Sequence, residues 1–172
     1  MPFAPMLFRT ARRIAARPDD ASDIVQETFL RAYRTFANFQ DGTNAKAWLF
    51  TIMYSIVSNQ WRADRRAPVE VPVDELEGRF GAALSAGQPD AEQVMLARLD
   101  ASPEVDRALR DLPDTQRAAV LMVDVEELTY EEAAAVLDCP VGTVRSRLAR
   151  GRKQLFVTLA DYARRTNAVR GR

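Results

Sequence analysis

The sequence predicts an all-α protein in which an acidic, flexible linker joins two small helical lobes. Apolar residues recur at helical spacing along most of the 172 residues, and no segment alternates apolar with polar residues for long. These helical patterns fall into residues 1–66 and 104–172. Residues 67–103 between them hold two basic and seven acidic residues, interrupted at short intervals by proline and glycine. We therefore predict a domain at each end and a linker in the middle.

The composition excludes several classes of protein. The chain is 47% hydrophobic and 28% charged, and arginines interrupt the apolar residues near its start. We therefore expect no membrane insertion and no export, and a cytoplasmic location. Cys139 is the single cysteine and histidine is absent, so we expect no internal disulfide, metal centre or cofactor. An enzyme is the least favoured class, because nothing in the sequence positions a general base.

Three helices are predicted in the first lobe. One spans Met6 to Ala16, the next begins near Asp20 and ends before the turn "QDGT", and the last follows that turn. The apolar stripe of the second helix consists of Val25, Phe29, Ala32 and Phe36. A different face of that helix presents Asp23, Gln26, Glu27, Leu30 and Arg34. The core face of the third helix consists of Ala45, Trp48, Leu49, Ile52, Ile56 and Asn59.

The second lobe begins with a short helix in "EVDRALRDL", and Pro113 opens the next one. That helix is expected to bury Ala118, Leu121, Met122 and Val125. Thr129 followed by Glu132 is a capping-box pattern, which predicts a helix start at "YEEAAAVLD". Pro140 fits the first turn of a final helix.

The elements from Tyr130 to Leu155 match a helix-turn-helix. Ala133 and Ala134 are small enough for two helices to cross closely. The docking positions of the second helix are Val141, Val144, Leu148 and Leu155. Exposed between them we expect Thr143, Arg145, Ser146, Ala149, Arg150 and Lys153. A recognition helix offers such donors to guanine edges and phosphates.

Charge along the chain is segregated, although the 24 basic and 24 acidic residues balance overall. Residues 104–138 hold three basic and ten acidic residues, whereas residues 139–172 hold nine basic and one acidic. The alternative is a solvated basic helix at the end of a bundle. The capping box, the small residues and the turn favour binding to DNA instead.

An aromatic face on the third helix is a second candidate for nucleic-acid binding. The face opposite the predicted core presents Phe50, Tyr54 and Trp61, followed by Arg62, Arg65 and Arg66. Rings stack on unpaired bases while guanidinium groups hold the backbone. Packing of these aromatics beneath a neighbouring element explains the same spacing equally well.

The segments "DDASDIVQETFLRAYRTFANFQDGTNAKAWLFTIMYSIVSNQWRADRR" and "LPDTQRAAVLMVDVEELTYEEAAAVLDCPVGTVRSRLARGRKQL" carry a resemblance to a known family. They resemble regions 2 and 4 of the extracytoplasmic-function (ECF) group of bacterial RNA polymerase sigma factors. The resemblance implies a protein that binds core polymerase, directs it to a promoter and helps to open the duplex. It also implies an anti-sigma factor as a partner.

The resemblance also implies roles for particular residues. The face of Asp23, Gln26, Glu27, Leu30 and Arg34 would bind the clamp helices of the largest polymerase subunit, and region 4 the flap of the second largest. The unpaired −10 strand would meet the loop from Phe39 to Asn44 and Trp48, Tyr54, Asn59, Trp61, Arg62 and Arg65. The −35 element would be contacted in the major groove by Thr143, Arg145, Ser146, Arg147, Ala149, Arg150 and Lys153.

Two other functions are alternatives to the sigma factor. A stand-alone helix-turn-helix regulator needs a dimer interface or an effector pocket, and neither is evident in the sequence. A sigma-like decoy is expected to lose its recognition-helix arginines, yet Arg145, Arg147, Arg150 and Arg152 are present.

Overall fold

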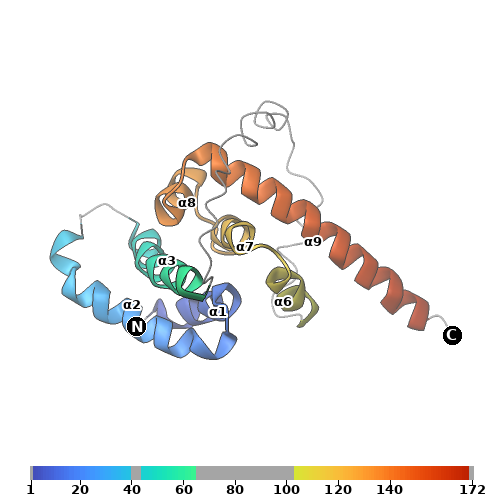
Figure 1. Ribbon diagram of the computed structural model, residues 1–172, viewed down its shortest axis with the longest axis horizontal. Coiled ribbons are helices and arrows are strands. Elements are labelled where there is room, and N and C mark those ends of the chain that lie inside the picture. The colour runs from blue at the N-terminus through green and yellow to red at the C-terminus, as the bar shows by residue number, and fades with distance from the viewer. Residues whose placement is uncertain (1, 40–43, 65–102, 171–172) are drawn as a thin grey trace.

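The computed structural model describes residues 2–39, 44–64 and 103–170, which form helices and no strand (Figure 1). The N-terminal lobe comprises α1 (Ala4–Ile14), α2 (Ala21–Arg34) and α3 (Ala45–Asp64). The C-terminal lobe comprises α6 (Pro103–Arg110), α7 (Asp114–Val120), α8 (Tyr130–Leu137) and α9 (Val141–Arg170). The predicted linker over residues 67–103 lies outside the described residues except for Pro103.

The buried side of α2 is rotated from the predicted stripe. Ile24, Thr28 and Ala32 are buried, whereas Phe36, which follows the helix, is 65% exposed. Thr28 tolerates full burial because its hydroxyl donates to the carbonyl oxygen of Ile24 at 2.7 Å. The prediction for Phe36 is wrong because the ring stacks locally on Phe39 instead of entering the core.

Helix α3 is buried on more sides than its predicted core face. Leu49 and Ile56 are buried as expected, but Phe50 and Met53 are completely buried and Asn59 is exposed. The cause is that α3 lies between α2 and α8 (Figure 1). The buried residues of both lobes consequently form one continuous hydrophobic core.

A π-helical segment, Leu121–Val125, continues α7. The amide of Glu126 donates to the carbonyl oxygen of Leu121 at 2.9 Å, the five-residue spacing of a π-turn. Leu121 and Met122 are buried as predicted, but Val125 is 37% exposed. The prediction for Val125 assumed α-helical spacing, and the π-turn shifts the side chains that follow it.

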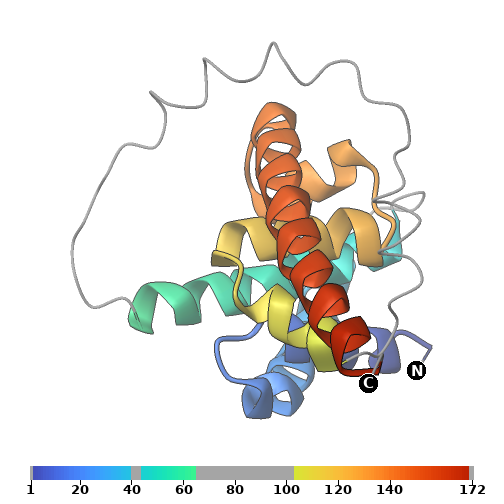
Figure 2. The same cartoon turned by 90° about the vertical axis from the view of Figure 1, so that its right-hand side faces the viewer.

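Helix α9 runs as one 30-residue helix across α6 and α7 (Figure 2). It passes α7 at Gly151, where a Cβ atom would lie 2.8 Å from Cγ2 of Val120. Three predicted docking residues of α9 are buried, namely Val144, Leu148 and Leu155. Close approach of the two helices therefore depends on the missing side chain at position 151.

The predicted capping box at the start of α8 is confirmed. The Thr129 hydroxyl accepts from the Glu132 amide at 3.2 Å, and the Glu132 carboxylate accepts from the Thr129 amide at 2.9 Å. Asp138 ends α8 in a left-handed conformation with φ of 49°, and α9 begins after Pro140. These signals set the turn of the helix-turn-helix.

Candidate nucleic-acid interface

The basic face of α9 is exposed where sequence analysis placed its charges. Arg145, Arg150 and Lys153 are exposed, and Thr143 and Ala149 are half-buried beside them. Because the opposite side of the helix is docked in the core, these side chains share one orientation toward solvent. The structure thus presents a rigid cationic surface, as an anion-binding helix requires.

Ser146 is not exposed, so its prediction as a surface residue is wrong. The side chain is 8% exposed, and its hydroxyl donates to the carbonyl oxygen of Thr143 at 3.1 Å. This back-bonding satisfies the hydroxyl within the first turns of α9. Ser146 therefore packs beneath the basic face in this conformation.

Arg152 takes part in the packing of the C-terminal lobe. Its guanidinium donates to both carboxylate oxygens of Asp124, with N–O distances of 3.0 and 2.5 Å. The hydrogen bond that Arg152 donates to Asp124 raises the pKa of Arg152. The side chain of Asp124 is 7% exposed, so this two-bond ion pair is buried and joins the π segment to α9.

The aromatic face of α3 is covered by the C-terminal lobe. Phe50 is fully buried and Trp61 is 6% exposed, so the prediction that both are presented to solvent is wrong for this conformation. Tyr54 is half-buried and meets Trp61 edge to face, with ring centres 5.8 Å apart. The interpretation that these aromatics pack beneath a neighbouring element holds here.

Arg147 lies close enough to Tyr54 of α3 for its charge to act on the phenol. Burial raises the pKa of Tyr54, and the positive charge of Arg147 opposes that effect. Arg147 is half-buried, unlike Arg145 and Arg150. Near the C-terminal end of α3, the exposed residues of the predicted −10 surface are Asn59 and Arg62, which are joined by a hydrogen bond of 3.0 Å. Arg65 and Arg66 lie outside the described residues.

A second aromatic group lies at the start of α3. The ring of Trp48 has its centre 5.0 Å from that of Phe39 and 6.4 Å from that of Phe36. Asn44 is exposed next to it and donates to Glu132 of α8 at 2.7 Å. This hydrogen bond is the main cause of the lowered pKa of Glu132. Residues 40–43 of the predicted −10 loop lie outside the described residues.

Polar contacts between the lobes centre on Glu126, which is 5% exposed. Its carboxylate accepts a hydrogen bond from the Thr10 hydroxyl and lies 3.1 Å from the Lys46 ammonium. Arg13 of α1 and Asp106 of α6 form a further ion pair at 2.8 Å. Sequence analysis missed these residues because each partner lies at least 80 positions away.

The predicted polymerase-binding side of α2 is free of the lobe interface. Asp23, Gln26 and Arg34 are exposed, and Leu30 is 51% exposed. Glu27 is half-buried and pairs with Arg31 at 2.6 Å. Tyr33, which sequence analysis did not select, is 85% exposed on the same helix. Its position could have been noticed in the sequence, because a large aromatic residue there lies outside the apolar stripe of the helix.

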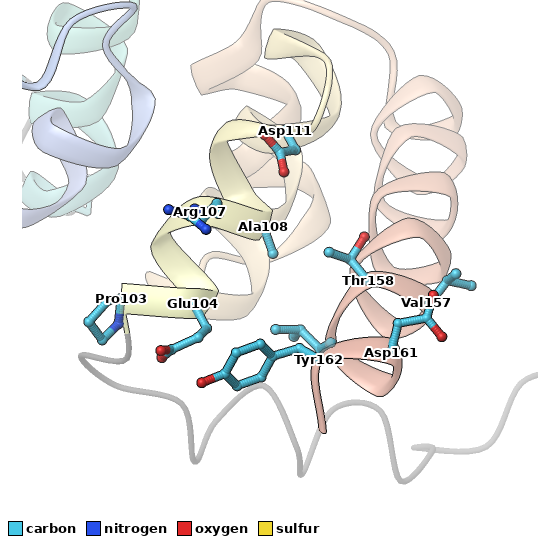
Figure 3. Close-up of a pocket in the computed structure, with 10 residues that line it drawn as sticks. Pro103, Glu104, Arg107, Ala108, Asp111, Val157, Thr158, Asp161 and Tyr162 are labelled. Carbon is cyan, nitrogen blue, oxygen red and sulfur yellow. The ribbon is translucent and has the colours of Figure 1, made fainter. Parts of the chain in front are cut away.

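A groove of about 420 Å³ separates α6 from the C-terminal half of α9 (Figure 3). Ala108, Val157 and Leu159 contribute apolar surface. Glu104 and Tyr162 approach each other at one end of the groove (Figure 3). The groove was not predicted, because it forms between helices that are distant in the chain.

Within residues 2–39, 44–64 and 103–170 no helix has the length and apolar character needed to cross a membrane. In the same part of the chain, no three acidic, cysteine or histidine side chains gather as a metal site would require.

The chain matches known proteins across both lobes. The Sigma-70 region 2 family matches residues 1–67, and the Sigma-70 region 4 family matches residues 102–155. The ECF RNA polymerase sigma factor EcfG of Rhodopseudomonas palustris is 37% identical over 155 residues, which cover 90% of this chain and 80% of that protein. This chain belongs to the ECF sigma factors. The ECF RNA polymerase sigma factor SigE of Mycolicibacterium smegmatis is also 37% identical, over 95% of this chain and 61% of that protein.

Two solved structures resemble the fold of this sigma factor. The sigma factor RpoE of Bartonella quintana, in complex with the anti-sigma factor NepR, superposes with a TM-score of 0.68 and 27% identity over 92% of both chains. CnrH in complex with the cytosolic domain of CnrY gives a TM-score of 0.61 and 25% identity, covering 93% of this chain and 84% of that one. The expected all-α fold with region 2 and region 4 is therefore confirmed.

Proposed function

We propose that this sigma factor binds core RNA polymerase, recognises −10 and −35 promoter elements and acts in transcription initiation, by binding rather than catalysis, in the cytoplasm. The observation that carries the proposal is the basic face of α9 on a capped helix-turn-helix. Arg145, Arg150 and Lys153 are exposed there, while Val144 and Leu148 are buried in the core. An anchored, cationic second helix is the form in which such motifs enter the major groove.

The −35 surface divides into base and phosphate contacts. Arg145 is placed near the N-terminal end of α9, the end that meets base edges in helix-turn-helix proteins. Arg150 and Lys153 lie further along the same exposed side and are suited to phosphates. Thr143 and Ala149 would complete the contact surface, and Arg147 would join it once α9 leaves α3.

The −10 surface requires the two lobes to move apart. In the described conformation Trp61 is buried and Asn44 is bonded to α8, so neither can meet an unpaired base. Arg62 and Asn59 are already exposed. Separation of the lobes would add Trp61 and Tyr54 to them as stacking rings, and Trp48 would serve as a further ring at the start of α3.

Two surfaces are proposed for the polymerase. The exposed side of α2, with Gln26 and Leu30, would bind the clamp helices of the largest subunit. The groove between α6 and α9 would take an apolar segment of the flap of the second-largest subunit, since its lining is largely apolar. The lining of neither surface includes Lys46, Glu126, Arg13 or Asp106, whose contacts join the lobes.

The proposed domains correspond to these separate binding functions. Residues 1–66 would act on the polymerase and the −10 element, residues 104–172 on the −35 element, and residues 67–103 would connect them as the acidic linker. An anti-sigma factor is a proposed further partner. The solved relatives RpoE and CnrH are each bound to a second protein, NepR or CnrY, and NepR is an anti-sigma factor.

Run-off transcription with purified core polymerase on a promoter library tests the proposal. The wild-type protein should yield transcripts from a subset of promoters that share −35 and −10 elements. The double substitution Arg145→Ala with Arg150→Ala should abolish these transcripts, while binding to core polymerase persists in a pull-down. Promoter binding without core polymerase and without transcription would instead identify a stand-alone regulator. Binding to a regulator such as an anti-sigma factor without binding to DNA would identify a decoy.

A further inference from the structure

We propose that Tyr130 is a positioning residue that holds Arg145 in place for contact with −35 bases. This inference rests on the proposed role of Arg145 and deepens it. Tyr130 begins α8, the first helix of the helix-turn-helix, and Arg145 lies on α9, the second. The guanidinium carbon of Arg145 is 5.2 Å from the centre of the Tyr130 ring, within the range of a cation–π contact.

The contact leaves the donors of Arg145 available. A guanidinium stacks on a ring through its flat face, whereas its N–H groups point outward in its plane. Guanine presents its O6 and N7 acceptors to that edge of the group. Arg145 remains exposed in the structure. One arginine can therefore lie on Tyr130 and hydrogen-bond to a guanine at the same time.

Tyr130 is itself held at its backbone. It directly follows Thr129, whose hydroxyl and amide exchange hydrogen bonds with Glu132 in the capping box. This arrangement fixes the first turn of α8 relative to the turn that precedes it. The ring is half-buried, so its position is set by packing as well as by the cap.

The hydroxyl end of Tyr130 lies beside a second fixed group. The hydrogen bond that Arg152 donates to Asp124 raises the pKa of Arg152 most, and interactions with the Tyr130 side chain add to that effect. Arg152 is held by both oxygens of Asp124. The ring of Tyr130 thus lies between the Arg152–Asp124 ion pair and the exposed side chain of Arg145.

The consequence is a smaller ordering cost when Arg145 binds. A long arginine side chain loses rotamer freedom on contact with a base, and a side chain already held in place loses less. Removal of the Tyr130 ring should therefore reduce discrimination at the base that Arg145 contacts. Contacts of Arg150 and Lys153, which do not touch Tyr130, should be unaffected.

The experiment measures binding of the full-length sigma factor, assembled with core polymerase, to a panel of single-base −35 variants. Wild type is compared with Tyr130→Leu, Tyr130→Phe, Arg145→Ala and the double variant Tyr130→Leu with Arg145→Ala. We expect Tyr130→Leu to lower discrimination about two- to fivefold, the equivalent of about 0.5–1 kcal/mol, only at the position that Arg145→Ala also affects. Tyr130→Phe keeps the ring and should keep most of the discrimination.

The double variant separates positioning from folding. If Tyr130 acts through Arg145, the leucine substitution should have no further effect on discrimination in the Arg145→Ala background, and any loss of folded protein common to both backgrounds cancels in the cycle. Equal weakening of every −35 variant, in both backgrounds, would overturn the inference by showing a structural role alone. An effect of Arg145→Ala without one of Tyr130→Leu would also overturn it. No effect of Arg145→Ala on discrimination would refute the proposed base contact itself.

Discussion

The guanidinium carbon of Arg117 in α7 lies 6.0 Å from the centre of the Trp61 ring in α3. Both residues are buried, and Nη2 of Arg117 also donates to the carbonyl oxygen of Ile14 in α1 at 3.3 Å. Burial lowers the pKa of Arg117, an effect that Asp114 opposes. A cation of the C-terminal lobe thus packs against the ring that is proposed to stack on unpaired DNA, so we expect Trp61 to reach DNA only after the lobes separate.

Loosening the lobe interface should expose Trp61. Glu126→Ala leaves Lys46 without its carboxylate partner, which should weaken the interface by about 1–3 kcal/mol. In a Trp48→Phe background, acrylamide should quench the fluorescence of Trp61 more strongly after this change. Glu127→Asn is the matched control, because Glu127 is exposed and asparagine tolerates its positive φ of 55°. Unchanged quenching in Glu126→Ala would contradict the assigned role of Glu126.

The exposed side of α2 should bind polymerase without stabilising the fold. Gln26→Ala combined with Leu30→Ala removes exposed side chains, so the unfolding midpoint should move little, within about 0.5 kcal/mol. Affinity for core polymerase, measured by titration with a labelled sigma factor, should fall. Thr51→Ala, on exposed α3 surface, serves as the control. Full affinity in the double variant would place the polymerase contact elsewhere.

Arg152→Ala should destabilise the protein, whereas the loss of an arginine that contacts DNA phosphate would weaken binding to every promoter alike. The change leaves the buried carboxylate of Asp124 unpaired, at a cost of about 3 kcal/mol. Replacing both partners, as Arg152→Met with Asp124→Leu, should restore much of that stability. Urea unfolding of the three variants measures the effect. A stable Arg152→Ala protein with uniformly weaker DNA binding would instead support the phosphate contact.

Acid should weaken the contacts of Glu132. Its pKa is lowered by hydrogen bonds from Asn44 and Thr129, so its contribution to stability is present above its ordinary value of 4.5 and is lost as the pH falls below it. Glu132→Gln should therefore lose less stability than the wild type when the pH is lowered from about 6 to about 3.5. This range extends roughly one to two units to either side of the ordinary pKa. The measurement is urea unfolding at each pH. If the stability of both proteins falls equally with pH, Glu132 does not cause the loss of stability in acid.

Two glycines of α9 should respond oppositely to alanine. At position 151 the new Cβ would meet Val120 at 2.8 Å, so Gly151→Ala should cost about 1–3 kcal/mol. At position 142 nothing lies within 4 Å of the Cβ, so Gly142→Ala should stabilise the helix by about 0.5–1 kcal/mol. Val120→Ala should recover part of the loss at position 151. Thermal unfolding of these variants gives the comparison.

Local signals in the sequence predicted the helix-turn-helix well. The capping box at Thr129, the proline before α9 and the docking residues Val144 and Leu148 act within a few turns of the chain, and the structure contains each of them. Periodicity did not predict which faces of α2 and α3 are buried. The two sides of α3 have different partners, and one of them comes from the distant C-terminal lobe.

The arginines of α9 also show which features can be predicted from sequence and which depend on contacts between distant residues. Their spacing placed Arg145 and Arg150 on the exposed side correctly. The ion pair of Arg152 depends on Asp124, which a π-turn displaces from ordinary helical register. Ser146 depends on a local hydrogen bond that competes with exposure. Residue type and spacing therefore predicted the cationic surface, whereas the partner of each charge required the fold.

The crossing of α7 and α9 at Gly151 also bears on how members of this family diverge. A side chain at position 151 and the Cγ2 methyl group of Val120 compete for the same volume. If a relative has alanine at position 151, it should have a residue smaller than valine at position 120. The two positions should therefore co-vary across related sequences, and a chain with bulky residues at both must have changed the distance between these helices.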